Sequence, residues 1–545
     1  MNLVESKPFL RVPPFPGSRG ADLVGSTRSG AGVARTEPAD LIADLRRWKI
    51  GGDYWAKQPQ PPHRPYTLVK VADPAQAAAY ASGDPVLIWS DGRAGLQSQA
   101  AISGACDPWH LLQNATRVVV DADDELALIT AIAGVPLVTV GEGRFSDLSG
   151  GGVPALEGAV DQHLIDAFEY VNPYTGERID AGVASRLCAF WRELIDSNRD
   201  ISAAFGFAFW KRPTVAPLLW AGKDVPFASD AKPARQGAVA VWKSRTPPQV
   251  VEALEREGAK LIEVEDGFIR STGLGSDCVP PLSIVVDRKG VHFDATQPSD
   301  LEDLLQNGSF DDEIVNRARV LRKLIVASGV SKYGSGSAQL SRRVANRRHV
   351  LVPGQVEDDR AVLTGGGPVT SNLDLLKRAR GEASDAYIIY KPHPDVEAGH
   401  RVGRIPESEC LKVADEVVRD QPISALIDLV DEIHVNTSLA GFEALLRSKP
   451  VTTHGVPFYA GWGLTRDLGL VPERRTARRS LDELVAAVLL LYPRYLDPVT
   501  GLPCPPEVLV RRIAEGAAAQ QGGAVVQLRR LQGRWKKRLA GLGSK

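Results

Sequence analysis

From about residue 66 onward, short apolar runs alternate with segments in which apolar residues recur every three to four positions. The runs Pro85–Trp89, Arg117–Val120 and Pro136–Val140 predict strands, whereas Leu126–Ala133 predicts a helix. Strands that alternate with helices at this spacing are typical of βαβ units and a parallel sheet. We therefore expect an α/β fold.

The second half of the chain shows the same alternation over a longer stretch. The predicted strands are Ala238–Trp242, Lys260–Val264, Leu282–Asp287, His349–Val352, Tyr387–Tyr390, Glu432–Val435 and Pro450–Thr453, and the predicted helices are Pro247–Glu257, Asp311–Ser328, Asn372–Ala379, Ile423–Leu429 and Leu439–Arg447. Two Rossmann-like units, over about 205–345 and 346–480, that face each other across a cleft are the simplest assembly.

Three segments of the second half resemble earlier ones in the same order, which indicates a duplication with a partial first copy. Pro108–Asp121 aligns with Pro422–Val435, Gly134–Thr139 with Ser448–Thr453, and Tyr170–Gly176 with Tyr495–Gly501. The copies differ where a strand gives way to a helix, because Asn436–Glu443 begins with hydroxyl side chains and its counterpart Ala122–Ile129 is acidic. Hydroxyls and free N–H groups at a helix N-terminus suit a phosphate, and carboxylates repel one. We expect the first copy to have lost its chemistry.

The length and the composition exclude several classes of protein. A length of 545 residues predicts three to four domains, and 65 Lys and Arg against 66 Asp and Glu exclude the strongly basic field of a general nucleic-acid binder. The five cysteines are far apart and form no CxxC pair, which argues against a zinc ribbon and indicates a reducing compartment. Without an apolar run of about 18 residues or a secretory leader, we expect a cytoplasmic protein.

Two clusters of polar residues follow predicted strands. Glu265, Asp266 and Gly267 come at the end of one strand, where carboxylates would lie over the cleft, although a solvated acidic turn is the alternative. In the segment YKPHPD (390–395), two prolines remove backbone donors and leave the side chains of Lys391 and His393 to bind a phosphate. A surface histidine is the alternative for this second cluster.

A third cluster, Asn436-Thr437-Ser438, stands between a strand and a helix of small residues. Thr437 and Ser438 could cap the helix and also bind phosphate oxygens, with Glu443 on the same helix in reach of a ribose. A plain helix cap is the alternative.

A metal site is not indicated. The acidic pair Asp121 and Asp123 lies in the first copy, away from the three clusters, and Glu357-Asp358-Asp359 has no partner motif. We expect no cofactor, because His and Lys side chains can carry the phosphate charge. Mg²⁺ at Glu357-Asp358-Asp359 is the alternative, which no partner motif supports.

At this point the sequence resembles a known family, the bacterial capsule polysaccharide β-Kdo transferases of the KpsC type. The resemblance covers about residues 205–515, with a decayed copy over 60–200. It rests on EDGFIRSTGLGSD (265–277), PLSIVVDRKGVHFDATQPSDLE (281–302), VPGQVEDD (352–359), YKPHPD (390–395) and NTSLAGFEALLRSKPVTTHGVPFYAGWGLT (436–465). It implies a GT-B fold, CMP-β-Kdo as donor, and transfer with retention to a Kdo-bearing lysophosphatidylglycerol-type acceptor in capsule linker synthesis.

The resemblance also implies roles for the clusters. Asp266 would be the catalytic carboxylate, which we favour as a nucleophile, with Glu265 as its neighbour and candidate base. His393 would bind or protonate the leaving CMP phosphate, and Thr437 and Ser438 would hold that phosphate.

Further candidate substrate-binding residues have weaker signals. Arg270 could pair with the Kdo carboxylate, since a bidentate guanidinium suits a planar anion, although an exposed loop arginine is the alternative. Gln355 and Asp358 could contact the sugar or acceptor, Lys391 could support the phosphate, and Asn436 belongs to the same strand end as Thr437.

These inferences divide the chain into five segments. They are a mobile N-terminal arm (1–60), a degenerate partial transferase module (61–200), an acceptor-side Rossmann-like lobe (205–345), a nucleotide-side Rossmann-like lobe with closing helices (346–515), and a basic tail (516–545). The tail, with Leu and Trp at helical spacing, suits an anionic inner-membrane surface where a lipid acceptor and other capsule transferases or exporters would be found. We expect no nucleic-acid partner.

Full-length members of the family have two complete modules, whereas this chain has one. A partner transferase, or transfer of another CMP-activated 2-keto sugar, would account for that difference. A non-catalytic scaffold in capsule assembly and a nucleotide-sugar epimerase are the rival hypotheses; the intact Asp266, His393 and Ser438 argue against the scaffold.

Overall fold

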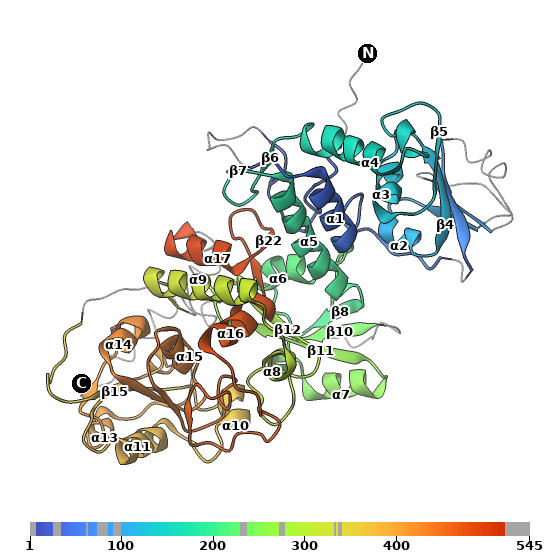
Figure 1. Cartoon of the computed structure of the whole chain (residues 1–545). Coiled ribbons are helices and arrows are strands. Elements are labelled where there is room, and N and C mark those ends of the chain that lie inside the picture. The colour runs from blue at the N-terminus through green and yellow to red at the C-terminus, as the bar shows by residue number, and fades with distance from the viewer. Residues whose placement is uncertain are drawn as a thin grey trace. The chain divides into compact units, whose positions relative to one another are not determined.

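The computed structural model describes residues 7–25, 34–61, 64–72, 85–90, 100–228, 237–271, 278–331, 334–335, 340–399 and 401–517 (Figure 1). The chain forms two compact units, unit 1 (Met1–Asp200 with Leu219–Asp224) and unit 2 (Ile201–Leu218 with Val225–Lys545). The predicted basic tail lies outside the described residues from 518 onward. Within the described part of the chain, none of the helices has the length and apolar character needed to cross a membrane.

Unit 1 is built on a five-stranded parallel sheet in the order β3-β2-β1-β4-β5. The strands are β1 (Tyr66–Lys70), β2 (Val86–Ser90), β3 (Ala100–Ser103), β4 (Ala115–Asp121) and β5 (Leu137–Val140), and the main helices are α2 (Pro108–Leu112), α3 (Glu125–Ala133), α4 (Gly152–Val160) and α5 (Ala181–Asn198). The whole of β2 and most of β1 are buried, as expected for a parallel sheet covered on both faces.

The segment predicted to be a mobile arm is largely packed where it is described. Helix α1 (Pro38–Trp48) buries Leu41, Ile42 and Leu45, and upstream of it Leu10 and Leu23 are fully buried. The difference has a physical reason. Apolar residues scattered among Pro and Gly have no helical or strand period, yet an irregular chain can still bury them.

Unit 2 contains two α/β lobes, and its first lobe has a seven-stranded mixed sheet in the order β22-β21-β12-β11-β10-β8-β9. Its strands are β8 (Ile201–Phe205), β9 (Phe227–Ala228), β10 (Ala238–Val241), β11 (Lys260–Asp266), β12 (Ser283–Asp287), β21 (Pro493–Leu496) and β22 (Pro503–Cys504). Strands β8 to β11 are parallel, whereas β12, β21 and β22 run antiparallel to their neighbours. The chain therefore returns from the second lobe to complete the first sheet.

The helices of the first lobe are α6 (Arg212–Leu219), α7 (Pro248–Arg256), α8 (Asp300–Asn307), α9 (Asp312–Ser328), α16 (Leu481–Val485) and α17 (Pro506–Ala514). Among these, α8, α9 and α16 begin at a residue whose side chain caps the N-terminus. Asp311 caps the N-terminus of α9, and Gly329, with a left-handed φ of 63°, ends it.

The second lobe has a six-stranded parallel sheet in the order β17-β16-β15-β18-β19-β20. The strands are β15 (His349–Pro353), β16 (Tyr387–Lys391), β17 (Glu416–Val417), β18 (Glu432–Val435), β19 (Val451–Thr453) and β20 (Arg466–Asp467), and the helices are α10 (Arg360–Gly365), α11 (Asn372–Glu382), α12 (Pro394–Glu397), α13 (Glu407–Cys410), α14 (Ile423–Leu429) and α15 (Leu439–Leu446). Figure 1 shows α11 and α13 on one side of this sheet and α14 and α15 on the other. The core on the first side packs Val350, Val352 and Ile388 against Leu375 and Leu376.

The sheets of unit 1 and of the second lobe share one topology. Strands β3-β2-β1-β4-β5 match β17-β16-β15-β18-β19 in order and direction, and each sheet has a helix between its fourth and fifth strands in chain order. The turns at Asn172 and Asp497 also match. Each carboxamide or carboxylate accepts backbone N–H groups two and three residues ahead, and each carbonyl accepts the N–H of the glycine four residues ahead. This shared topology supports the predicted duplication.

Candidate functional site

The two lobes of unit 2 line a cleft of about 1010 Å³. Nine predicted site residues lie in its wall: Glu265, Asp266, Arg270, Gln355, Lys391, His393, Thr437, Ser438 and Glu443. They come from the carboxyl ends of β11, β15, β16 and β18, because the ends of parallel strands meet at one edge of each sheet. Asp358 and Asn436 are outside this wall.

Asp266, the last residue of β11, lies between two cations. Lys211 Nζ donates to Oδ1 at 3.1 Å, and Arg270 Nε donates to Oδ2 at 2.8 Å. The carboxylate remains 28% exposed, so that it still faces the cleft. Two cations at this distance favour its ionised form, which is the form a nucleophile needs.

Lys211 is a functional candidate that the sequence did not reveal. It precedes α6, its side chain is 6% exposed, and its Nζ lies 3.2 Å from the centroid of the Trp242 ring. Burial lowers the pKa of Lys211 to about 8, and the negative charge of Asp266 limits that fall. Its only signal in the sequence is a lysine that ends an aromatic run, and this does not point to Asp266.

Glu265 is oriented differently from Asp266. It accepts from Arg360 at 3.1 Å, and the same guanidinium nitrogen is 2.5 Å from Glu263. Burial, and next the charge of Asp266, raise the pKa of the Glu265 carboxyl. Arg360 begins α10 in the second lobe, so this ion pair joins the two lobes across the cleft, and it too was absent from the predicted site.

Arg270 lies in the cleft wall beside Asp266, with its side chain almost wholly buried. It is 1% exposed, and its other two nitrogens donate to Ser271 Oγ and to the Val279 carbonyl at 2.8 Å each. This arrangement suits a residue that fixes Asp266, while the pairing of Arg270 with a substrate carboxylate stays a prediction.

The N-terminus of α15 carries Thr437 and Ser438 at the opposite wall. The side-chain amide of Gln355 makes two hydrogen bonds to Thr437. Its Nε2 donates to Thr437 Oγ1 and its Oε1 accepts from the Thr437 N–H, each at 2.9 Å. Ser438 caps the helix, since its Oγ accepts from the Ala440 N–H. Both hydroxyl oxygens thus accept a protein N–H, which leaves each O–H proton to donate to an anion.

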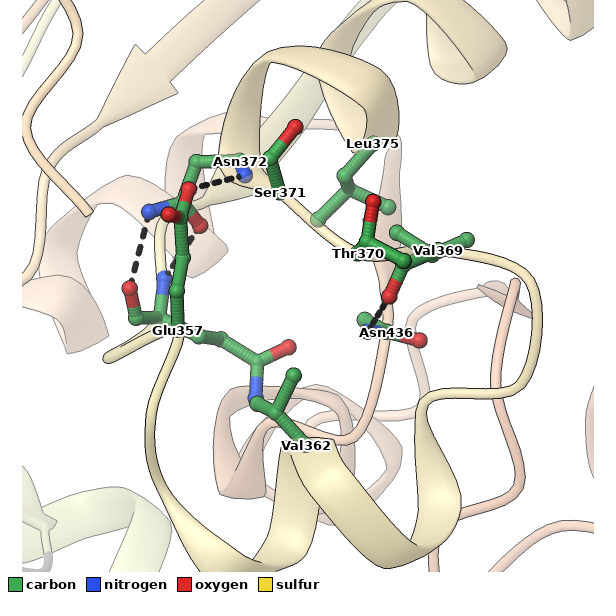
Figure 2. Close-up of a pocket in the computed structure, with 9 residues that line it drawn as sticks. Glu357, Val362, Val369, Thr370, Ser371, Asn372, Leu375 and Asn436 are labelled. Carbon is green, nitrogen blue, oxygen red and sulfur yellow. Dashed lines mark hydrogen bonds between the residues drawn. The ribbon is translucent and has the colours of Figure 1, made fainter. Parts of the chain in front are cut away.

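Asn372 holds Gln355 in place through its carboxamide. Figure 2 shows Asn372 beside Glu357 in the adjoining pocket. The Asn372 carboxamide accepts from the Gln355 N–H and donates to the Gln355 carbonyl, both at 2.8 Å, while Glu357 accepts the Asn372 N–H. Asn436 lines this pocket of about 10 Å³ and donates to the Val369 carbonyl at 3.4 Å. Asn436 therefore supports the strand end from behind.

Lys391 and His393 lie on the loop after β16. Lys391 Nζ donates to the Arg419 carbonyl at 3.0 Å, and burial lowers the pKa of the Lys391 ammonium. His393 caps α12, with Nδ1 accepting the Asp395 N–H at 3.2 Å. In the neutral ring this contact puts the proton on Nε2, which becomes the donor.

The remaining predicted residues differ in exposure. Asp358 is an exposed partner of Arg401, with Oδ1 3.1 Å from the guanidinium. Glu443 is 7% exposed and lies in the cleft wall on α15. Across the described ranges, His, Cys, Asp and Glu side chains form no group of three or more that could hold a metal ion.

In unit 1, charged side chains that pair with one another lie at the corresponding edge of the sheet, between β4 and α3. Asp124 caps α3 and pairs with Lys70 at 2.8 Å, and Asp121 accepts the Ala72 N–H. Glu125, in the first turn of α3, pairs with Arg11. These contacts support the prediction that this copy does not bind a phosphate.

The chain matches the family model described as "Capsule polysaccharide biosynthesis protein" over residues 237–339 and 327–495. It is 40% identical over 342 residues to the capsule polysaccharide modification protein LipA of Neisseria meningitidis serogroup A, covering 61% of this chain and 48% of LipA. It is 44% identical over 239 residues to the lipopolysaccharide-processing protein LpsZ of Rhizobium meliloti, covering 43% and 54%. The chain spans about half the length of these curated relatives.

Among solved structures, the β-Kdo 2,4 transferase of Thermosulfurimonas dismutans KpsC is 33% identical to this chain, with a TM-score of 0.51. The match covers 57% of this chain and 98% of that structure. Together with two α/β lobes that face a cleft, it confirms the predicted GT-B fold.

Proposed function

The chain belongs to the KpsC-type family of capsule polysaccharide biosynthesis proteins, and we propose that its second unit is a glycosyltransferase that moves Kdo from CMP-β-Kdo to a lipid-linked Kdo acceptor. One observation carries the proposal. A carboxylate held between two cations, Asp266, lies in the same cleft as the hydroxyl donors at the N-terminus of α15.

The wall of the cleft that carries Asp266 suits a reaction with retention of configuration. When CMP leaves, positive charge develops at the anomeric carbon of Kdo, and Asp266 is placed to trap that carbon as a covalent ester. Retention then follows from two displacements, as in glycosidases with one nucleophilic carboxylate. Lys211 and Arg270 keep Asp266 ionised and oriented before attack.

The opposite wall suits the leaving group. Thr437 and Ser438 offer hydroxyl protons beside a helix N-terminus, and His393 offers Nε2–H. Donors that are already fixed by the protein stabilise charge that appears on a phosphate without further reorganisation. We assign these three residues, with support from Lys391, to the CMP phosphate.

The proposed acceptor and the proposed cellular location are supported by the family to which the chain belongs, and by no contact among the residues that the structure describes. We propose a Kdo-terminated lipid at the inner-membrane surface, approached from the cytoplasm, with other capsule transferases as partners. The cleft of unit 2 has the proposed catalytic residues, whereas the corresponding sheet edge in unit 1 is occupied by charged side chains such as Asp124 and Lys70. We therefore expect one transferase activity from the described residues.

The test is a transfer assay with purified protein, CMP-Kdo generated in situ and a synthetic Kdo-terminated acceptor. Wild type should release CMP and add the mass of one Kdo to the acceptor. Asp266→Asn should lose both, by a factor of about 10² to 10⁴ or more. Asp385→Asn, an exposed acid that faces solvent at 84% side-chain exposure, is the matched control and should keep wild-type activity.

An acceptor that gains no mass, together with no CMP release by wild type, would refute the transferase. Release of CMP with another CMP-activated 2-keto sugar, and none with CMP-Kdo, would keep the reaction class and replace the donor.

A further inference from the structure

Lys211 has an unusual setting for a lysine in a cleft wall. Its ammonium is enclosed by the Trp242 ring on one side and by Asp266 on the other, and its side chain is 6% exposed. It nevertheless lines the cleft. A cation needed only to neutralise Asp266 would be redundant here, since Arg270 already contacts the second carboxylate oxygen at 2.8 Å.

We propose that Lys211 is the general base that takes the proton from the acceptor hydroxyl during the second half of the transfer. This inference rests on the proposed function, because it requires Asp266 to form an ester with the sugar. It assigns to Lys211 a role beyond orienting Asp266.

The charges around Lys211 explain how one amine can be an ammonium early in the reaction and a base later. Burial and Arg270 lower the pKa of Lys211, while Asp266 and Glu265 raise it. Glu265 is held by Arg360, whereas Asp266 accepts directly from Lys211 Nζ at 3.1 Å. Asp266 is therefore the main group that keeps the proton on Lys211.

Formation of the ester removes that charge. Asp266 attacks the anomeric carbon, the bond from this carbon to the phosphate oxygen breaks, and CMP leaves with the electron pair. The esterified Asp266 is neutral, whereas burial and Arg270 still act on Lys211. The ammonium then gives its proton to the water of the cleft and becomes a neutral amine.

The second displacement reverses these charges. The acceptor oxygen forms a bond to the anomeric carbon, its proton moves to Lys211 Nζ, and the bond to Asp266 breaks with the electron pair on the carboxylate. Lys211 is again an ammonium beside an ionised Asp266. Overall, Kdo is transferred, CMP is released, and one proton enters the solvent.

Neighbouring groups are less suited to this role. Arg270 and Arg360 carry guanidinium groups, which do not lose their protons in proteins. Glu265 is held by Arg360, and burial raises its pKa, which disfavours the ionised form that a base needs. His393 caps α12 in the second lobe, on the side that we assign to the phosphate.

The experiment separates the two half-reactions in Lys211→Met and Lys211→Arg. The first variant has no amine, and the second keeps a cation that cannot act as a base. Lys260→Met, at the exposed start of β11, is the matched control. CMP release is followed by rapid quench, the Asp266 ester by intact-protein mass spectrometry, and transfer by the mass of the acceptor, each with and without azide.

Both Lys211 variants should release about one CMP per enzyme and accumulate the ester, with transfer slowed by a factor of about 10² to 10⁴. Azide is a nucleophile that needs no base, so it should restore breakdown of the ester in the variants and yield the Kdo azide. In wild type, ester breakdown should slow as the pH falls, and this pH dependence should be lost in Lys211→Arg.

Three results decide the question. Wild-type transfer by Lys211→Arg would overturn the inference while leaving the proposed function intact. Loss of the CMP burst in both folded variants would also overturn it, since Lys211 would then act only through Asp266. A wild-type protein that neither releases CMP nor forms the ester would refute the proposed function itself.

Discussion

Replacement of Gly441 by alanine tests whether Tyr459 is packed against α15 as described. A Cβ at position 441 would lie 2.2 Å from the Tyr459 hydroxyl oxygen and 2.7 Å from the ring carbon that carries it. Tyr459 is fully buried, and its hydroxyl donates to the carbonyl of Ser438, the residue that caps this helix. The added methyl group therefore has to push the ring away from the helix N-terminus.

The expected cost follows from three contributions. Alanine gains about 1 kcal/mol over glycine within a helix. Overpacking costs about 1–3 kcal/mol, and the buried Tyr459 hydroxyl costs about 1–3 kcal/mol when it is displaced from its acceptor. We therefore expect Gly441→Ala to lower the free energy of unfolding by about 1–5 kcal/mol, because the two unfavourable contributions together exceed the helix gain.

The matched control is Gly381→Ala in α11, where no atom lies within 4 Å of the added Cβ. This variant should be neutral or more stable by up to about 1 kcal/mol. Urea denaturation of both variants measures the difference, and Gly441→Ala combined with Tyr459→Phe should recover part of the loss. If Gly441→Ala were as stable as Gly381→Ala, the described packing of Tyr459 on α15 would be refuted.

Two further predictions concern buried charge. Burial, with His434 Nδ1 3.1 Å away, lowers the pKa of His454 to about 4, below its ordinary value of about 6.5. The stability that depends on a neutral His454 is complete above pH 6.5 and is lost as the pH falls toward 4, by about 3 kcal/mol at most. Urea denaturation at pH 7 and at pH 5 measures this loss. The free energy of unfolding should differ less between the two pH values in His454→Phe than in wild type. In unit 1, Asp107 is fully buried and accepts from Arg192 at 2.8 Å, so Asp107→Ala should cost about 3–5 kcal/mol, whereas the exposed Asp147→Ala should change stability by less than about 0.5 kcal/mol. Equal effects of the two aspartate variants in calorimetry would contradict this second prediction.

The strands and helices of unit 2 follow closely from local patterns. Predicted strands at 349–352 and 432–435 are observed as β15 and β18, and the predicted helix at 311–328 is observed as α9 within one residue. These elements are long or strongly apolar, and Gly or Asp residues mark their ends. Local periodicity and capping were sufficient there.

What the sequence did not predict depends on contacts between distant residues. Lys211 and Asp266 are 55 positions apart, and Arg360 and Glu265 are 95 apart, so no local pattern connects either pair. The direction of β12 is a similar case, since an apolar run looks the same whether it pairs parallel or antiparallel. The orientation of Arg270 is another such case, because it depends on Val279, whose position only the folded chain determines.

The two hydrogen bonds between the Gln355 amide and Thr437 have a consequence for product release. Because Thr437 and Ser438 each already accept a protein N–H group, their O–H protons are left to donate toward the cleft, and such donors favour a ligand with the most negative oxygens. A phosphate monoester loses its second proton near pH 6, at about the value known for phosphorylated side chains. Under the proposed function, inhibition by free CMP should therefore strengthen as the pH rises through that value, and mildly acidic conditions should hasten emptying of the cleft.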